Sequence, residues 1–192
     1  MINHKGTQNI KTERLLLRKI LPDDAEMVYL WMSDPDVCKY ERWSPHQSIG
    51  YTRGYIVEVF DGYQSELTYQ WGIQLGDELI GSVSIVNVND YDQKAVLGYC
   101  LAKKYWSKGY TTEAAKSVIH YMLCEVGLNR IEASHSVNNI ASGRVLQKIG
   151  MVLEGFAKQY YFSNSGLQDS NLYAITSKDY EITFGNIRRD AS

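Results

Sequence analysis

The sequence is poor in cysteine and proline, and each shortage excludes a class of protein. Only three cysteines (Cys38, Cys100 and Cys124) and three prolines occur among 192 residues. The cysteines are odd in number and form no CxxC pair, which argues against a disulfide framework or a zinc site. We therefore expect a reduced compartment and no metal. No Pro/Ser-rich linker or internal repeat interrupts the chain, which predicts one domain.

Long apolar runs and dense basic blocks are also missing. No apolar run is long enough to cross a bilayer, and the first twenty residues contain no signal-like apolar segment. The net charge is −2, and no basic stripe marks a nucleic-acid surface. These absences predict a cytoplasmic protein that binds neither membrane nor nucleic acid.

The residues that are present divide the chain into three parts. Residues 1–11 read as a flexible arm, residues 12–180 as the folded domain and residues 181–192 as a tail. Near the start of the domain, Pro22 followed by two aspartates suits a first helical turn, and Ser48 suits the N-cap of a second helix. The segment 36–47 between these helices reads as a loop.

Hydrophobic periodicity predicts the remaining elements. After Gly109, apolar residues recur every four positions as far as Gly127, which predicts a long amphipathic helix. The element order βααβββαβαββ predicts an α/β (α+β) fold in which a mixed, mostly antiparallel sheet of about seven strands is flanked by about four helices. The predicted strands cover residues 12–20, 67–75, 78–88, 95–102, 130–137, 152–163 and 169–177, and the predicted helices cover 22–32, 48–62, 109–127 and 139–148.

The turn before the long helix has the features of an anion site. The segment from Trp106 to Thr111 leads from a strand directly into the helix, whose first amides have no partner within it. Gly109 lets the backbone approach a ligand closely, so a pyrophosphate would fit, although an ordinary turn has the same pattern. The segment matches neither a GxxxxGK[ST] loop nor a GxGxxG fingerprint.

A second segment lies about thirty residues further along the chain. Asn139 stands at the start of a helix, and Ser142 follows one turn later. Taken alone, Asn139 is a helix cap and Ser142 an ordinary first-turn residue. The pairing of this segment with the Gly109 turn strengthens the case for a binding site.

Together the two segments resemble a known family. "YWSKGYTTEA" followed by "VNNIASGRVLQKIGMVLEG" resembles the coenzyme-A motifs of the GNAT N-acetyltransferase superfamily. Within it the chain is most similar to the RimJ/RimL-type branch, which acetylates protein N-termini, including those of ribosomal proteins. "TERLLLRKI" and "QDSNLYAI" also resemble that branch, so the resemblance extends from about Thr12 to Asp179.

The resemblance implies acetyl-CoA as co-substrate and assigns residues to it. The backbone of Tyr99 and Leu101 would pair with the pantetheine arm, while Asn139 and Ser142 would lie near the thioester. Trp106 stands where many members carry Gln or Arg, so the backbone must do more of the phosphate binding. The pyrophosphate would be held by the amides of Ser107, Lys108, Gly109, Tyr110, Thr111 and Thr112, with the Lys108 charge in support.

Two of the superfamily's usual catalytic side chains are absent at the matching positions. Val96 stands where many members carry a glutamate on the strand, and Leu146 stands where many carry a tyrosine on the second helix. Ser142 remains as the candidate donor to the departing sulfur. His135 is a candidate base because imidazole titrates near neutral pH. An equally good interpretation is that His135 is a half-buried strand residue that packs against its neighbours. Tyr161, or its neighbour Tyr160, is a candidate for an assisting role.

The resemblance implies an N-acetyltransferase acting on a primary amine, most simply a protein or peptide N-terminal α-amine. An α-amine titrates near ~8 and a lysine near ~10.4, so the α-amine needs less help to become neutral. A small-molecule amine (polyamine, aminoglycoside or amino acid) remains an alternative acceptor. A non-catalytic acetyl-CoA sensor is an alternative of another class, and a homodimer is compatible with the branch.

The N-terminal half supplies the expected acceptor walls, namely the two helices and the loop 40–46. Glu41, Glu58 and Glu66 are candidate partners for a cationic amine. Most of the fifteen tyrosines are expected to serve packing. The aromatic residues singled out for these walls are Trp43, Trp71, Tyr55, Tyr63 and Tyr69.

Overall fold

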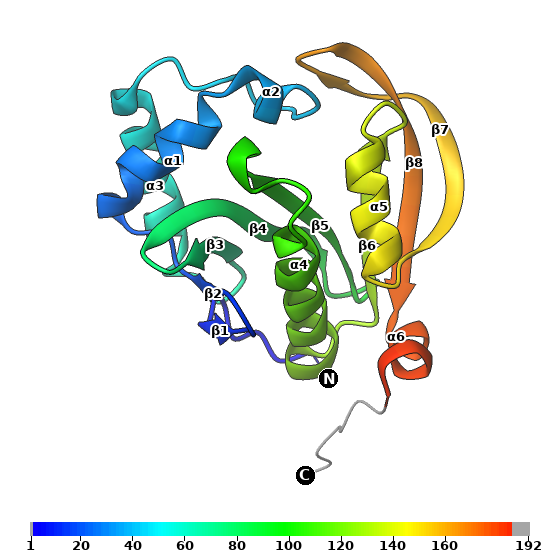
Figure 1. The fold of residues 1–192 in the computed structure, drawn as a ribbon. Coiled ribbons are helices and arrows are strands. Elements are labelled where there is room, and N and C mark those ends of the chain that lie inside the picture. Colours follow the sequence, from blue (N-terminus) through cyan, green and yellow to red (C-terminus); the bar gives the residue numbers. More distant parts are fainter. Residues whose placement is uncertain (1, 186–192) are drawn as a thin grey trace.

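A computed structural model describes residues 2–185 of the chain. One sheet runs through the molecule in the strand order β1-β2-β3-β4-β5-β6-β8-β7 (Figure 1). The strands are β1 (Ile10–Lys11), β2 (Leu16–Arg18), β3 (Tyr69–Leu75), β4 (Glu78–Asn89), β5 (Lys94–Leu101), β6 (Arg130–Ser136), β7 (Val152–Ser163) and β8 (Gly166–Thr176). The helices are α1 (Ala25–Met32), α2 (Pro35–Cys38), α3 (Ile49–Gly62), α4 (Tyr110–His120), α5 (Ile140–Lys148) and α6 (Ser177–Phe184).

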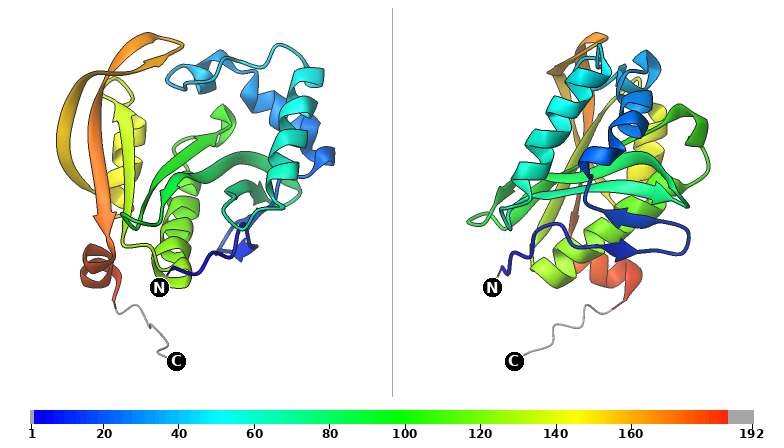
Figure 2. Two further views of the ribbon diagram at one scale, coloured as in Figure 1. Left: turned by 180° about the vertical axis from the view of Figure 1, so that it is seen from behind. Right: turned by 90° about the vertical axis from the view of Figure 1, so that its left-hand side faces the viewer.

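Helices cover both faces of the sheet (Figure 2). Adjacent residues of β4 divide between the two sides, as the alternation of a strand requires. Leu79 lies in the apolar cluster formed with α1 and α3, whereas Ile80 lies in the larger cluster formed with α4. The expected α/β class with a mixed sheet is therefore confirmed.

The count and order of elements differ from the prediction at three places. Ile10 and Lys11 form an eighth strand against β2. The predicted loop contains the short helix α2, which Asp34 caps by accepting from the Asp36 amide at 2.9 Å. The chain also enters α6 after β8, because Thr176 and Asp179 form a reciprocal cap.

The N-terminal segment is not the loose arm that its polar sequence suggested. The Thr7 hydroxyl donates to the Thr68 carbonyl at 2.8 Å, and the Trp71 indole donates to the Gln8 carbonyl at 2.6 Å. These tertiary bonds hold Thr7 and Gln8 beside β3, which a sequence pattern cannot show. Residue 1 and residues 186–192 of the predicted tail lie outside the described residues, while α6 occupies the start of that tail.

The predicted helix boundaries are close to those observed. The Ser48 hydroxyl accepts from the Tyr51 amide at 3.2 Å and so caps α3, as predicted. The long helix does end at Gly127, whose φ is +87°. Its last part, Tyr121–Val126, is π-helical rather than α-helical.

The two parallel strands separate where the candidate site lies. β5 and β6 pair only at Lys94 with Arg130, Ala95 with Ile131 and Val96 with Glu132. Beyond these pairs one backbone edge of β5 is unpaired, and α4 and α5 follow the two strands in the chain and lie side by side (Figure 1). The divergence opens the sheet between the two segments that the sequence singled out.

Candidate active site

The turn before α4 has the backbone geometry of an anion-binding nest. Gly109 is the N-cap of α4 with φ +82°, and Ser107 also has a positive φ of +62°. No side chain caps this helix, so its first amides have no intramolecular partner of the usual kind. Exposed amides at the positive end of a helix dipole suit a pyrophosphate. The local geometry therefore fits the cofactor that the sequence implied.

Arg14 supports this turn, and the sequence analysis missed it. Its guanidinium donates to the Lys108 carbonyl at 3.1 Å, lies 4.6 Å from the centre of the Tyr110 ring and pairs with Glu113 at 2.7 Å. The charges of Arg14 and Glu113 were visible in the sequence. Their 99-residue separation gave no sign that they meet.

The open edge of β5 carries the positions assigned to the pantetheine arm. The indole N–H of Trp106 donates to the Leu101 carbonyl at 2.7 Å. The Leu101 carbonyl, which was expected to pair with the pantetheine arm, therefore already accepts one hydrogen bond from Trp106. This bond ties the turn to the end of β5, so Trp106 has a structural role.

Ser142 and Tyr99 meet across the opening between β5 and α5. The Asn139 side chain accepts from the Ser142 amide at 3.2 Å, which fixes the first turn of α5. The Tyr99 hydroxyl lies 2.9 Å from Ser142 Oγ and 3.2 Å from the Ser142 carbonyl oxygen. Burial raises the pKa of Tyr99 well above its usual value, so its hydroxyl keeps its proton. Sequence reasoning had considered only the backbone of Tyr99.

His135 is separated from the cavity described below. Its ring is buried, with Nδ1 2.7 Å from the Ser136 carbonyl, so that this nitrogen donates. Its other nitrogen, Nε2, faces α5 so closely that a Cβ at Gly143 would lie 2.7 Å away. The side chain follows Ile131 and Ala133 on the core face of β6, which the alternating pattern of the strand explains.

Tyr161 lies on β7 and supports a loop. Its hydroxyl donates to the Tyr40 carbonyl at 2.9 Å, and the Arg42 guanidinium stacks on its ring at 4.5 Å. The β7–β8 hairpin, at one edge of the sheet, thus contacts the loop between α2 and α3 (Figure 2). Tyr160 is exposed on the same strand.

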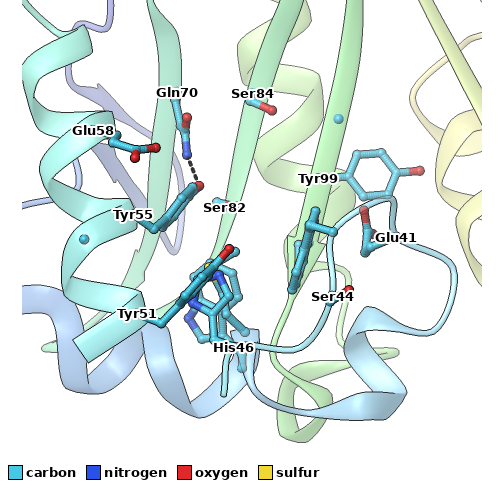
Figure 3. Close-up of a pocket in the computed structure, with 16 residues that line it drawn as sticks. Glu41, Ser44, His46, Tyr51, Tyr55, Glu58, Gln70, Ser82, Ser84 and Tyr99 are labelled. Atoms are coloured by element: carbon cyan, nitrogen blue, oxygen red, sulfur yellow. Dashed lines mark hydrogen bonds between the residues drawn. The ribbon is translucent and has the colours of Figure 1, made fainter. Parts of the chain in front are cut away.

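A cavity of about 500 Å³ lies between α1, α3, the 40–46 loop and strands β3, β4 and β5 (Figure 3). Glu41 and Glu58 line it, and among residues 2–185 no lysine or arginine does. Burial lowers the pKa of His46, whose Nδ1 lies 2.9 Å from the Thr52 hydroxyl, so this ring is neutral at pH 7. The walls are therefore negative, which favours a cationic ligand. Its aromatic walls are Trp31, Trp43, Tyr51, Tyr55 and Tyr99.

Only part of the predicted acceptor wall reaches this cavity. Trp43 and Tyr55 line it, as expected. Trp71 and Tyr69 belong to the buried core instead, because they lie on the face of β3 that α4 covers. Tyr63 hydrogen-bonds the Gln70 carbonyl at 2.9 Å. The remaining carboxylate, Glu66, lies outside the cavity lining.

Comparison with known proteins decides the family. A family model described as an acetyltransferase (GNAT) domain matches residues 14–152. The chain belongs to the GNAT acetyltransferase family. The expected fold and acyltransferase class are confirmed, and the enzyme is an acetyl-CoA-dependent N-acetyltransferase.

Individual relatives support the same assignment. The chain is 32% identical over 168 residues to the uncharacterized N-acetyltransferase YoaA of Bacillus subtilis, covering 86% of this chain and 95% of YoaA. It is 34% identical over 98 residues to the ribosomal-protein-serine acetyltransferase of Escherichia coli, covering 51% and 55%. It shares its fold, at a TM-score of 0.80 and 20% identity, with RimL, a ribosomal L7/L12 α-N-protein acetyltransferase solved with coenzyme A. That match covers 88% of this chain and 98% of the other.

Two expectations concern membranes and metals. Within residues 2–185 no helix has the length and apolar character that crossing a bilayer requires. Among the same residues, no three His, Cys, Asp or Glu side chains gather in a way that could hold a metal ion. The expectation that the enzyme needs no metal stays a prediction.

Proposed function

We propose that the enzyme acetylates the α-amine at the N-terminus of a protein or peptide, by direct attack on acetyl-CoA in a ternary complex. The observation that carries this proposal is the negatively lined cavity that ends at Tyr99, the hydrogen-bond partner of Ser142. Similarity to a ribosomal-protein-serine acetyltransferase supports a protein acceptor. An α-amine, with a reference pKa near ~8, also needs less deprotonation than a lysine.

Acetyl-CoA would lie across the opening between β5 and β6. The amides from Ser107 to Thr112 would bind the pyrophosphate, with Lys108 adding positive charge. The free edge of β5 at Tyr99 and Leu101 would pair with the pantetheine arm. Asn139, as the cap of α5, would keep the helix start in position near the thioester.

Ser142 would donate a proton to the departing sulfur. The Tyr99 hydroxyl orients it, since one of the two oxygens donates to the other across 2.9 Å. Tyr161 would act indirectly, because its hydroxyl holds the 40–46 loop, which forms one wall of the cavity. His135, buried beneath α5, would contribute through packing rather than as a base.

A small-molecule amine is the second candidate acceptor. The cavity volume of about 500 Å³ falls within the range of roughly 300–1,000 Å³ usual for sites that enclose small ligands. A polyamine, an aminoglycoside or an amino acid would each bring the cationic group that the walls favour. The two candidates differ in whether the acceptor must extend beyond the cavity.

An acceptor panel tests the proposal. Thiol release from acetyl-CoA would be measured with peptides bearing free N-termini, their N-blocked counterparts, polyamines, aminoglycosides and amino acids. We expect turnover with free N-termini, and about a 10²-fold loss of kcat in Ser142→Ala, as is typical for loss of a proton donor. The control Ser117→Ala lies on the side of α4 and should keep full activity. Tight acetyl-CoA binding without turnover on any amine would instead favour a sensor.

A further inference from the structure

The loop between α2 and α3 brings a carboxylate to the reaction end of the cavity. Glu41 lines the cavity, and its side chain lies beside the Tyr99 ring (Figure 3). Tyr99 in turn contacts Ser142, the proposed proton donor. Glu41 and Ser142 thus both lie next to Tyr99, at the end of the cavity where amine and thioester would meet.

The backbone on both sides of Glu41 is held by the β7–β8 hairpin. The Tyr161 hydroxyl donates to the Tyr40 carbonyl at 2.9 Å, and the Asn164 side chain donates to the Trp43 carbonyl at 2.8 Å. These bonds flank Glu41 in sequence and come from a different part of the sheet. A carboxylate fixed in this way keeps its position without an ion pair of its own.

No cation neutralises Glu41 within the part of the chain that the structure describes. The adjacent Arg42 stacks on the Tyr161 ring instead. Burial raises the pKa of Glu41 to about 7, with a contact to the Trp43 side chain opposing the shift. The titratable groups that face its carboxylate are Cys38, Tyr99, Cys100 and Tyr161, none of them cationic.

The second carboxylate of the cavity lies elsewhere. Glu58 is exposed on α3, on the side where the Gln70 amide donates to the Tyr55 hydroxyl at 2.7 Å (Figure 3). Its place in the cavity suits it to a distant positive group of the acceptor rather than to the reacting amine. The geometry therefore separates one carboxylate near the reaction from another at the far wall.

We propose that Glu41 binds the ammonium form of the acceptor and takes its proton. The inference rests on the proposed function. The freed nitrogen lone pair then forms the carbon–nitrogen bond as the carbon–sulfur bond breaks, and the electron pair of that bond goes to sulfur. The remaining excess proton of the nitrogen passes through the Ser142 hydroxyl to the thiolate, and Glu41 releases its own proton to water. One amide, one thiol and one proton result, so the step balances.

The pH profile of kcat/KM for the acceptor tests this role. Wild type should lose activity as the pH falls through about 7, because Glu41 becomes protonated there. Glu41→Gln should lower kcat/KM by about 10²–10⁴-fold and abolish that limb of the profile, while calorimetry shows unchanged acetyl-CoA affinity. Glu41→Asp, which keeps the carboxylate, should retain the limb with partial activity.

The controls separate the two proposals. Glu66→Gln, outside the cavity, should match wild type, and Glu58→Gln should raise KM for cationic acceptors while keeping the pH limb. A Glu41→Gln enzyme with wild-type kcat/KM and an unchanged limb would overturn the role of Glu41 alone. A wild-type enzyme that binds acetyl-CoA but acetylates no acceptor would overturn the proposed function, and the role of Glu41 with it.

Discussion

The two halves of the active site are built from different materials. The proposed cofactor half, from β5 through the turn to α4 and α5, presents backbone groups: a left-handed Gly109, a helix start without a side-chain cap and an unpaired strand edge. The proposed acceptor half presents side chains from α1, α3, the 40–46 loop and three strands. Backbone recognition depends on a short continuous segment, whereas a side-chain wall depends on how distant elements pack. The comparison predicts that the halves can be damaged independently.

The largest expected effect comes from breaking the cofactor half at Gly109. Gly109→Val places a β-branched residue at φ +82°, a conformation that costs L-residues roughly 1–2 kcal/mol or more. We expect the acetyl-CoA Kd to rise at least about tenfold, measured by calorimetry. Gly76→Val is the matched control, because Gly76 also has a positive φ (+58°) but lies in the β3–β4 turn. Equal acetyl-CoA affinity in both variants would refute the proposal that the Gly109 turn binds the pyrophosphate.

The next effect concerns the support beneath that turn. Burial raises the pKa of Glu113, but hydrogen bonds from Thr12 and Arg14 outweigh this and hold it below its usual value. Glu113 therefore stabilises the fold above the unfolded-state pKa of about 4.5, and this contribution is lost as the pH falls through the lower folded-state value. We expect Glu113→Gln to lower the free energy of unfolding by about 2 kcal/mol at pH 7.

Urea unfolding at pH 7 and below pH 4 checks this expectation. The difference in the free energy of unfolding between wild type and Glu113→Gln should be smaller at the lower pH. Glu125→Gln removes a more exposed carboxylate, paired with Lys5 at 2.9 Å, and should cost less than about 1 kcal/mol. If this difference in the free energy of unfolding does not change with pH, the ionised carboxylate is not the stabilising group.

The smallest expected effect comes from weakening the 40–46 loop of the acceptor half at Asn164. The Asn164 side chain donates to the carbonyls of Cys38 and Trp43, both at 2.8 Å. Loss of about 1 kcal/mol of loop stabilisation in Asn164→Ala should raise the acceptor KM by roughly fivefold, with acetyl-CoA affinity unchanged. Asn89→Ala, at the end of β4, provides the control. A parallel loss of cofactor affinity would show that the halves are coupled.

The sequence was most informative where function depends on local backbone. The turn at Gly109, the cap at Asn139 and the strand preceding each helix could all be placed from spacing and residue type. Family resemblance then tied the two segments to one cofactor. The exact helix type was less accessible, since the change to π-helix at Tyr121 has no clear sequence sign.

Contacts between distant residues escaped prediction for a physical reason. Tyr99 with Ser142, and Arg14 with Glu113, join residues 43 and 99 positions apart. Trp71 could not be told from a cavity aromatic, because burial depends on which face of β3 the helix α4 covers. Propensity and periodicity report local structure and say little about such partners.

The sequence by itself therefore determined the fold class and the family, and it predicted the segment proposed to bind the cofactor, because each follows from a local pattern. Only the tertiary structure decided that Thr7 and Gln8 are held beside β3, that His135 lies beneath α5 and that Glu41 lines the cavity. The side-chain environment of a residue depends on elements that approach from elsewhere in the chain. Glu41 becomes buried, and its pKa is raised, only when those elements have packed together.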